Sequence, residues 1–232
     1  MHLFYSTTIL HNQIELDKDE SRHLSKVLRL TNGDAVVVVD GEGNWYNCQI
    51  AEAHGKKALL NIIQQEDRLE EFNVEIASAP TKNLSRWEWF LEKSTEIGID
   101  AIHPISTFHS ERKVLKRERQ ERILVSAMKQ SYKAKLPHLS DMQKLEEFIK
   151  LDFDGEKYIA HCEEGLPKMK LNSIHPKGKK ALILIGPEGD FSKEEILAAT
   201  AAGFRPISLG KSRLRTETAA LVACHTIHLI HA

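Results

Sequence analysis

Two glycine-containing segments in the C-terminal half of the chain have the composition of ligand-binding loops. The first is Gly186-Pro187-Glu188-Gly189, which follows the apolar run "LILI". Ser192 and Glu195, just after it, have the spacing of a capping box, so helix initiation explains them. Loops after the strands of an open α/β sheet commonly bind ligands, and glycine permits close backbone approach. From spacing alone, a plain turn is an equal alternative for this loop.

The second segment is "LGKSRLRTETAA", from Leu209 to Ala220. Its Gly-Lys-Ser resembles the end of a phosphate-binding P-loop, but that motif needs a glycine at position 205, where the chain has Arg205. A nucleotide-hydrolysing enzyme is therefore disfavoured. The plain structural interpretation is that Thr216 caps a final helix, whose apolar residues lie on nearly all sides and indicate burial against several neighbours.

Metal chemistry is not indicated by the histidines of that final helix. His225, His228 and His231 recur every three residues, and this spacing drifts by about 60° per step on a helix, so the rings do not converge on one ion. The three cysteines are far apart and form no CxxC pair. The sequence predicts no metal site.

A strongly basic stretch suggests a polyanionic partner. From Arg112 to Lys135 the chain has nine Lys or Arg and two Glu, while the whole protein has a formal net charge of −1. One part of an otherwise acidic protein is thus strongly positive. A solvated helix face is the alternative, but the imbalance favours a surface for nucleic acid.

Composition indicates a globular protein of the cytoplasm. Apolar residues make up 41% and charged residues 28% of the 232 residues. No apolar run approaches the roughly 20 residues needed to cross a bilayer, and the N-terminal sequence does not have the pattern of a secretory signal. We therefore expect a cytoplasmic protein.

The elements that would position these motifs fall into two parts. Residues 1–70 contain a helical pattern with Leu24, Val27 and Leu28 on one face, then short β-rich runs separated by Gly-containing turns. A charged connector around residues 64–71 follows. Beyond it, strand and helix patterns alternate, which predicts an α/β domain with a largely parallel sheet over residues 71–232.

Four segments together resemble one enzyme family. "RHLSKVLRLTNGD", "EKSTEIGI", "IGPEG" and "LGKSRLRTETA" occur in the order and spacing of the RsmE family, the 16S ribosomal RNA uridine-N3 methyltransferases of the SPOUT superfamily. The resemblance implies a PUA-like RNA-binding β-barrel in residues 1–70 and a trefoil-knotted SPOUT α/β methyltransferase domain in residues 71–232. It also implies a homodimer that uses S-adenosylmethionine to methylate N3 of a uridine, uracil 1498, in the small ribosomal subunit.

The same resemblance implies where the cofactor and the reacting groups lie. Arg215 and Glu217 are candidates for stabilising the uracil anion and accepting its proton, although orienting the loop or the dimer would explain them equally well. The residues expected to contact the cofactor are Ile185, Gly186, Pro187, Glu188, Gly189, Leu209, Gly210, Leu214, Arg215, Thr216, Thr218 and Ala219.

Contacts with RNA are expected from both parts of the chain. The candidates are Arg22, His23, Arg29, Lys82, Lys129, Lys133 and Lys135. Lys133 and Lys135 stand where the family frequently has arginine, and lysine lacks the bidentate fork of a guanidinium. Asp190 stands where a second glycine is usual, and the sequence assigns it no role. The alternative function is that of a non-catalytic RNA-binding protein of ribosome assembly that retains the fold.

Overall fold

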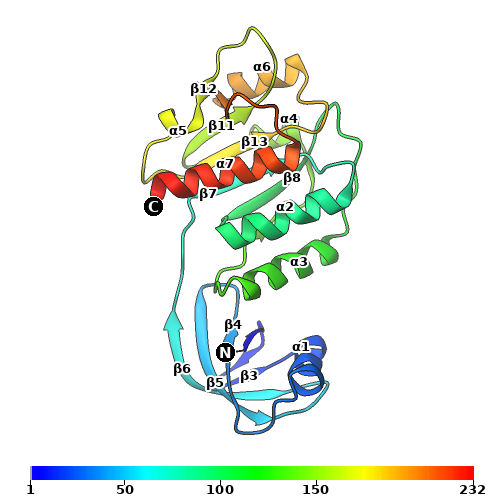
Figure 1. The fold of residues 1–232 in the computed structure, drawn as a ribbon, viewed down its shortest axis with the longest axis vertical. Helices are drawn as coiled ribbons and strands as arrows, with labels where there is room; N and C mark the ends of the chain where they lie inside the picture. Colours follow the sequence, from blue (N-terminus) through cyan, green and yellow to red (C-terminus); the bar gives the residue numbers. More distant parts are fainter. Residues whose placement is uncertain (1) are drawn as a thin grey trace. The chain divides into compact units, whose positions relative to one another are not determined.

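The computed structural model describes residues 2–232 and divides the chain into two compact units (Figure 1). The first unit contains the chain up to Glu70 together with Val125–Leu136, and the second contains Glu71–Leu124 and Pro137–Ala232. The domain limits predicted from the sequence place Val125–Leu136 in the second domain, whereas the structure groups this segment with the first unit. Helix α3 (Arg117–Gln130) contributes residues to both units.

The first unit is a curled six-stranded sheet with a short helical segment. All its strand pairings are antiparallel except that of β1 with β4, and the strand order is β1-β4-β5-β6-β3-β2. Its elements are β1 (Leu3–Tyr5), β2 (Ile9–Leu10), β3 (Gln13–Glu15), α1 (Lys18–Arg22), the π-helix η1 (His23–Val27), β4 (Ala35–Val39), β5 (Asn44–Glu52) and β6 (Leu59–Asp67). The expected PUA-like β unit is confirmed as a curled sheet.

Strand β4 explains why a distant segment joins this unit. Successive strand residues point to opposite faces of a sheet, and in β4 both faces are buried. Val36 and Val38 pack in one core cluster, whereas Val37 and Val39 pack in another that includes Met128 from the Val125–Leu136 segment. The uninterrupted valine run therefore requires apolar cover on its second face.

The second unit is built on a sheet in which every pairing is parallel. The strand order is β10-β8-β7-β13-β11-β14-β12, with β9 also paired to β8. Its remaining elements are β7 (Val74–Ser78), α2 (Leu84–Ile97), β8 (Ala101–Ser106), β9 (His138–Leu139), β10 (Gln143–Lys144), α4 (Leu145–Phe148), β11 (Glu156–Ala160), β12 (Met169–Lys170), α5 (Leu171–Ile174), β13 (Ala181–Ile185), α6 (Lys193–Ala201), β14 (Arg205–Ser208) and α7 (Thr216–His231). The predicted α/β class is confirmed.

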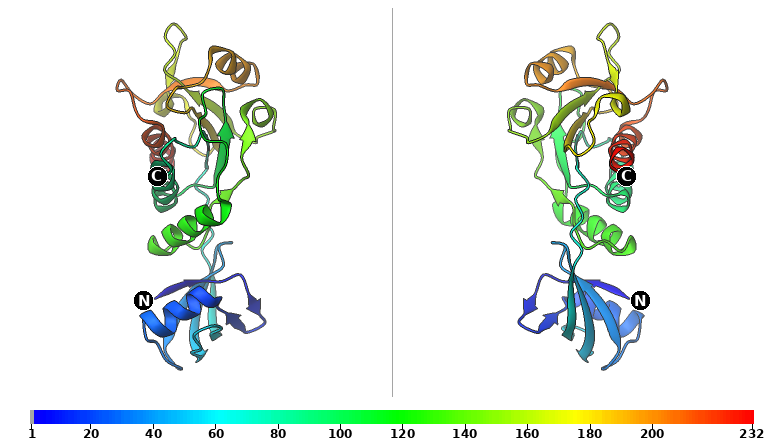
Figure 2. Two further views of the ribbon diagram at one scale, coloured as in Figure 1. Left: turned by 90° about the vertical axis from the view of Figure 1, so that its right-hand side faces the viewer. Right: turned by 90° about the vertical axis from the view of Figure 1, so that its left-hand side faces the viewer.

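Helices cover both faces of this sheet. Helices α2 and α7 lie side by side on one face, and α4 and α6 lie on the other (Figure 2). Strand β13 is buried along its whole length, as expected of a strand covered on both faces. The capping box that the sequence predicts is present at the start of α6, where Ser192 caps the Glu195 amide and the Glu195 carboxylate accepts a hydrogen bond from the Ser192 amide.

The first helical segment differs from its sequence pattern. The pattern predicts one amphipathic helix that buries Val27, but α1 is followed directly by a π-helix and the Val27 side chain is 66% exposed. A π-helix has a wider turn than an α-helix, so the spacing that would bring Val27 to the buried face is lost.

Within residues 2–232, no helix has the length and apolarity needed to cross a membrane.

Candidate functional site

A cavity of the second unit lies where three neighbouring parallel strands end. Ala160, the last residue of β11, is in register with Ile185 at the end of β13 and with Ile207 near the end of β14. The loops after these strands enclose a cavity of about 690 Å³. A crevice at the carboxyl ends of strands is the usual ligand site of an open α/β sheet, and this volume suits a cofactor-sized molecule.

Most of the residues that the sequence assigned to a cofactor site line this cavity. They are Ile185, Gly186, Pro187, Glu188, Leu209, Gly210, Leu214, Arg215, Thr216 and Ala219. Gly189 and Thr218 are outside its lining. The two loops, which are more than twenty residues apart in sequence, therefore form two sides of the same cavity.

Sequence reasoning missed a third side of the cavity. Ala160, His161 and Cys162, at the end of β11, line it together with Glu164 and Lys168. This segment contains no glycine motif, so its composition gives no ligand-binding signal. The available signal is positional, because "KYIAHC" has the β-rich composition of a strand and a strand end in such a sheet is a candidate for ligand contact.

Asp190 connects two of the loops that line the cavity, those after β13 and β11. Its carboxylate accepts hydrogen bonds from the Cys162 amide at 2.6 Å and from the Phe191 amide at 2.8 Å. Its backbone is left-handed, with φ of 62°, a conformation that Asp and Asn tolerate better than most residues. Asp190 therefore fixes the loop after β13 against the loop after β11.

The two glycines of the loop after β13 serve packing within the protein. A Cβ atom on Gly186 would lie 3.1 Å from the Phe191 backbone nitrogen, so a side chain would displace the turn itself. A Cβ atom on Gly189 would lie 3.0 Å from the Cβ atom of His109, whose ring nitrogen Nδ1 is 3.0 Å from the Asp190 carbonyl oxygen. Gly189 is thus needed where the loop packs against His109.

His161 is a buried polar side chain in the cavity wall. It is 7% exposed, and neither ring nitrogen has a hydrogen-bond partner in the described structure. Burial lowers the pKa of the His161 imidazole, and the nearby Lys168 ammonium lowers it further. Lys168 is held in place because its ammonium donates to the carbonyl oxygens of His161, at 3.3 Å, and Glu163, at 2.8 Å. The wall therefore favours a neutral imidazole beside a fixed cation.

The two catalytic candidates lie on different sides of the first turn of α7. Arg215, the residue before the helix, is exposed and lines the cavity. Glu217 is buried, with 8% exposure, and does not line this cavity. It lies instead beside a smaller cavity with Arg86, whose Nε is 3.9 Å from the Glu217 Oε1.

The RNA candidates of the first unit differ in how accessible they are. Arg22 and Arg29 are exposed and form no ion pair within residues 2–232. His23 is half-buried, with its ring tilted against Phe4 at 5.9 Å between centroids. Lys129 forms a half-buried ion pair with Glu20. Arg22 and Arg29 are therefore the most accessible cations among these candidates.

The remaining candidates make contacts within their own unit. Lys133 Nζ is 3.7 Å from a carboxylate oxygen of Glu70, and Lys135 forms backbone bridges with Gly41 and Glu42. In the second unit, Lys82 is exposed and pairs with Glu111 at 2.9 Å. The Lys82 amide donates to the Glu188 carboxylate at 3.1 Å, so Lys82 lies beside the loop after β13.

Comparisons with known proteins give one consistent result. A family described as "RNA methyltransferase domain" matches residues 68–228, and one described as "RNA methyltransferase PUA domain" matches residues 16–63. The chain is 31% identical over 231 residues to the Ribosomal RNA small subunit methyltransferase E of Synechocystis, covering 96% of this chain and 75% of the relative. It is 29% identical to the Bacillus subtilis protein of the same name, over 90% and 87% of the two chains.

Solved structures agree in fold over the full chain. A probable rRNA-methyltransferase from Porphyromonas gingivalis is 41% identical, with a TM-score of 0.92 over 100% of this chain and 98% of that one. Ribosomal RNA small subunit methyltransferase E from Neisseria gonorrhoeae, solved bound to S-adenosyl methionine, is 27% identical, with a TM-score of 0.86 over 100% and 98% of the two chains.

Replacing Asp190 should destabilise the cavity wall. We expect Asp190→Ala to lower the free energy of unfolding by roughly 2–4 kcal/mol, because it removes two hydrogen bonds to a carboxylate and places alanine in a left-handed conformation. The Cys162 amide, freed from its acceptor, should exchange its hydrogen faster. Denaturant unfolding and hydrogen exchange measure both effects. Asp190→Asn is the matched control, since it keeps one of the two acceptor oxygens and tolerates the backbone, so its loss should be smaller. An equal loss in both variants would contradict the assignment.

Proposed function

Because the chain belongs to the family of ribosomal RNA small subunit methyltransferases E, we propose that it transfers a methyl group from S-adenosylmethionine to N3 of a uridine in 16S ribosomal RNA. Family membership supports the reaction class. A fold alone does not establish a function, so the cavity must also suit the reaction. The observation that carries the proposal is the cavity at the ends of β11, β13 and β14, formed by loops that the chain brings together from three regions.

The chemistry of the cavity walls suits S-adenosylmethionine. Apolar side chains of Ile185, Ile207 and Leu209 offer a surface for a purine ring, and the glycine-containing loops bring backbone groups to its edge. The carboxylates of Glu164 and Asp190 suit the ammonium or sulfonium cation. Lys168 suits the carboxylate of the amino-acid moiety, and His161 would gain a partner for its ring nitrogens.

In the proposed reaction the protein aligns two reactants and removes one proton. S-adenosylmethionine supplies an electrophilic methyl group when bound. Holding donor and acceptor in line accounts for much of the rate enhancement of such a displacement. Uracil N3 carries a proton that must be accepted, and Glu217 is the proposed acceptor. Arg215, exposed on the rim of the cavity, is proposed to stabilise the negative charge that develops on the uracil.

Positive charge near the cavity supports an RNA substrate. Lys211, Arg213 and Arg215 are exposed around its opening and form no ion pair within residues 2–232. Cations of this kind bind phosphates without sequence preference. We propose that Arg22 and Arg29 on the first unit add phosphate contacts. Lys129, Lys133 and Lys135 contribute less, since Lys129 and Lys133 pair with acidic side chains and all three are half-buried.

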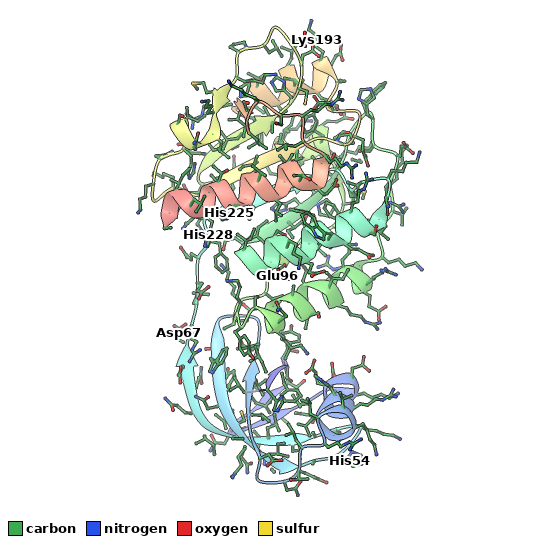
Figure 3. The ribbon with its side chains drawn as sticks, viewed as in Figure 1. His54, Asp67, Glu96, Lys193, His225 and His228 are labelled. Carbon is green, nitrogen blue, oxygen red and sulfur yellow. The ribbon has the colours of Figure 1, made fainter. Side chains whose placement is uncertain are left out.

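Helix α7 has apolar side chains on the side that does not face its own unit. Ala220, Ala223, Cys224 and Ile227 are buried, yet Leu229 is 61% exposed, and His225, labelled in Figure 3, is also exposed. Leu221, Val222 and Ile230 of the same helix are half-buried, and a group of partly exposed apolar side chains favours association. We propose that α7 forms the interface of a homodimer. We also propose, from the family resemblance, that the chain of the second unit forms a trefoil knot. A ribosomal substrate would place the protein in the cytoplasm.

Transfer of labelled methyl groups tests the reaction. With tritiated S-adenosylmethionine, we expect label to enter small ribosomal subunits prepared from cells that lack this protein, at N3 of one uridine of the 16S RNA. Naked 16S RNA serves as the second substrate and shows whether assembly is required. Labelling of another base would refute the assigned substrate. If titration calorimetry detected no binding of S-adenosylmethionine, a non-catalytic role in ribosome assembly would replace the enzyme.

Removing two exposed arginines should weaken RNA binding and its salt dependence. We expect Arg22→Gln combined with Arg29→Asn to lower the affinity for small ribosomal subunits by about tenfold at low salt. The slope of log affinity against log salt should fall by about 2, as expected for two lost phosphate contacts. Asparagine suits the left-handed backbone of Arg29, whose φ is 56°. Lys150→Gln with Lys193→Gln removes the same charge from other exposed positions, and an equal effect there would argue against a specific surface.

A charge placed on α7 should separate the subunits. Sedimentation of the wild-type protein is expected to give the mass of a dimer, and Leu229→Glu should give a monomer, because a carboxylate would be buried without a partner at the interface. Leu197→Glu on α6 is the control, since Leu197 is 53% exposed and lies on the other face of the sheet. A monomeric wild-type protein would remove this proposal.

A further inference from the structure

A second, smaller cavity lies at the first turns of α2 and α7. It has a volume of about 400 Å³ and is lined by Ser85, Arg86, Trp89, Glu217 and Thr218, all in the second unit. Thr216 lines the larger cavity and the next two residues line the smaller one. Successive residues of an α-helix point about 100° apart, so the two cavities adjoin the same first turn of α7.

Glu217 is a buried carboxylate that lacks a full set of partners. Its Oε2 atom is buried and accepts no hydrogen bond in the described structure. Arg86 approaches the other oxygen only to 3.9 Å, beyond hydrogen-bond distance. The positive end of the α7 dipole favours a negative charge in this first turn, but a buried acceptor still lacks a donor. A bound group that donates a hydrogen bond would supply it.

Trp89 gives the same cavity an aromatic wall. Its side chain is 40% exposed, although it is a large apolar residue, and it follows Ser85 and Arg86 by about one turn of α2. Exposed aromatic rings are the surfaces on which proteins stack unpaired RNA bases. The other side chains of the lining, Ser85, Arg86 and Thr218, all carry hydrogen-bond donors.

We propose that this cavity binds the acceptor uracil, with the base stacked on Trp89 and its N3 facing Glu217. The proposal rests on the methyltransferase function proposed above. Uracil has one N–H donor at N3 between two carbonyl acceptors, which matches one carboxylate flanked by donors. Cytosine has no proton at N3 and would present a lone pair to the carboxylate. The cavity therefore binds uracil more tightly than cytosine, because bound cytosine would leave the Glu217 carboxylate without a hydrogen-bond donor.

The position of Glu217 also completes the proton balance. Its carboxylate takes the N3 proton and becomes a carboxylic acid, and the electron pair left on N3 forms the new N–C bond. The C–S bond of the methyl donor breaks, its electron pair stays on sulfur, and the sulfonium becomes a neutral thioether. No further reactant is required.

Trp89 offers a direct readout of base binding. The chain has three tryptophans, and Trp45 and Trp87 are 2% and 1% exposed, so only Trp89 is accessible for stacking. We expect an oligouridylate of about ten nucleotides to quench the fluorescence of the wild-type protein more than the matched oligocytidylate does. Absence of quenching, or equal quenching by the two, would overturn the assignment.

Variants separate the roles of the two side chains. Trp89→Ala should weaken binding of a fluorescein-labelled oligouridylate by about 5- to 100-fold, and Trp89→Phe should restore most of it. Glu217→Gln should lower kcat by about 100-fold or more while S-adenosylmethionine affinity stays within about twofold. Its residual rate should rise with pH, because uracil N3 ionises unaided in alkali. Leu197→Ala, which removes another exposed apolar side chain, should change none of these values.

The outcomes distinguish this assignment from its alternatives. If Trp89→Ala lost RNA binding only because it became monomeric by sedimentation, the cavity would be an interface between copies of the chain. If the wild-type protein methylated RNA and the Trp89 and Glu217 variants did so equally, the acceptor site would lie elsewhere and the enzyme function would stand. If the wild-type protein bound no S-adenosylmethionine, the function itself would fail.

Discussion

Parallel pairing on both sides of β11 is the constraint on which the candidate site depends. The last residue of this strand is in register with residues at or near the ends of β13 and β14, so three chain segments leave the sheet at one place. The peptide groups of the strands are paired within the sheet, and the loops that follow carry backbone groups free to meet a ligand. A cavity at this edge is therefore a consequence of strand order, and the loop sequences determine what it binds.

Polar contacts help to hold the loops at this edge of the sheet. Asp190 links the loops after β13 and β11, and Glu195 accepts a hydrogen bond from the Phe108 amide at 2.8 Å in addition to capping α6. One carboxylate thus starts a helix and fixes the loop after β8. Because Asp190 and Glu195 each connect two segments of the chain, the cavity should be sensitive to substitution of these two carboxylates.

Local patterns predicted the parts of the fold that local physics determines. The β-rich first part, the alternation of strands and helices in the second part and the capping box of α6 follow from apolar runs, glycines and caps. The short strands β1, β2 and β3 were not predicted, because residues such as Ile14 become strand only through pairing with β6. The cofactor candidates came from the family resemblance that the two glycine loops carry, because local spacing left a plain turn equally acceptable, and His161 had no local signal. Its role depends on which strands neighbour β11, and strand order is not encoded in local spacing.

The first turn of α7 shows how one short segment can serve two reactants. Thr216 lines the larger cavity and Glu217 the smaller one, so a group bound in each would approach the same turn from different sides. An in-line displacement needs its nucleophile and leaving group in contact with the transferred carbon, so the proposed reaction requires the two bound groups to meet beside this turn. A helix start provides rigid geometry and a positive dipole end for a carboxylate that must remain charged until it accepts a proton. The apolar body of α7, packed against the sheet and α2, holds that turn in place.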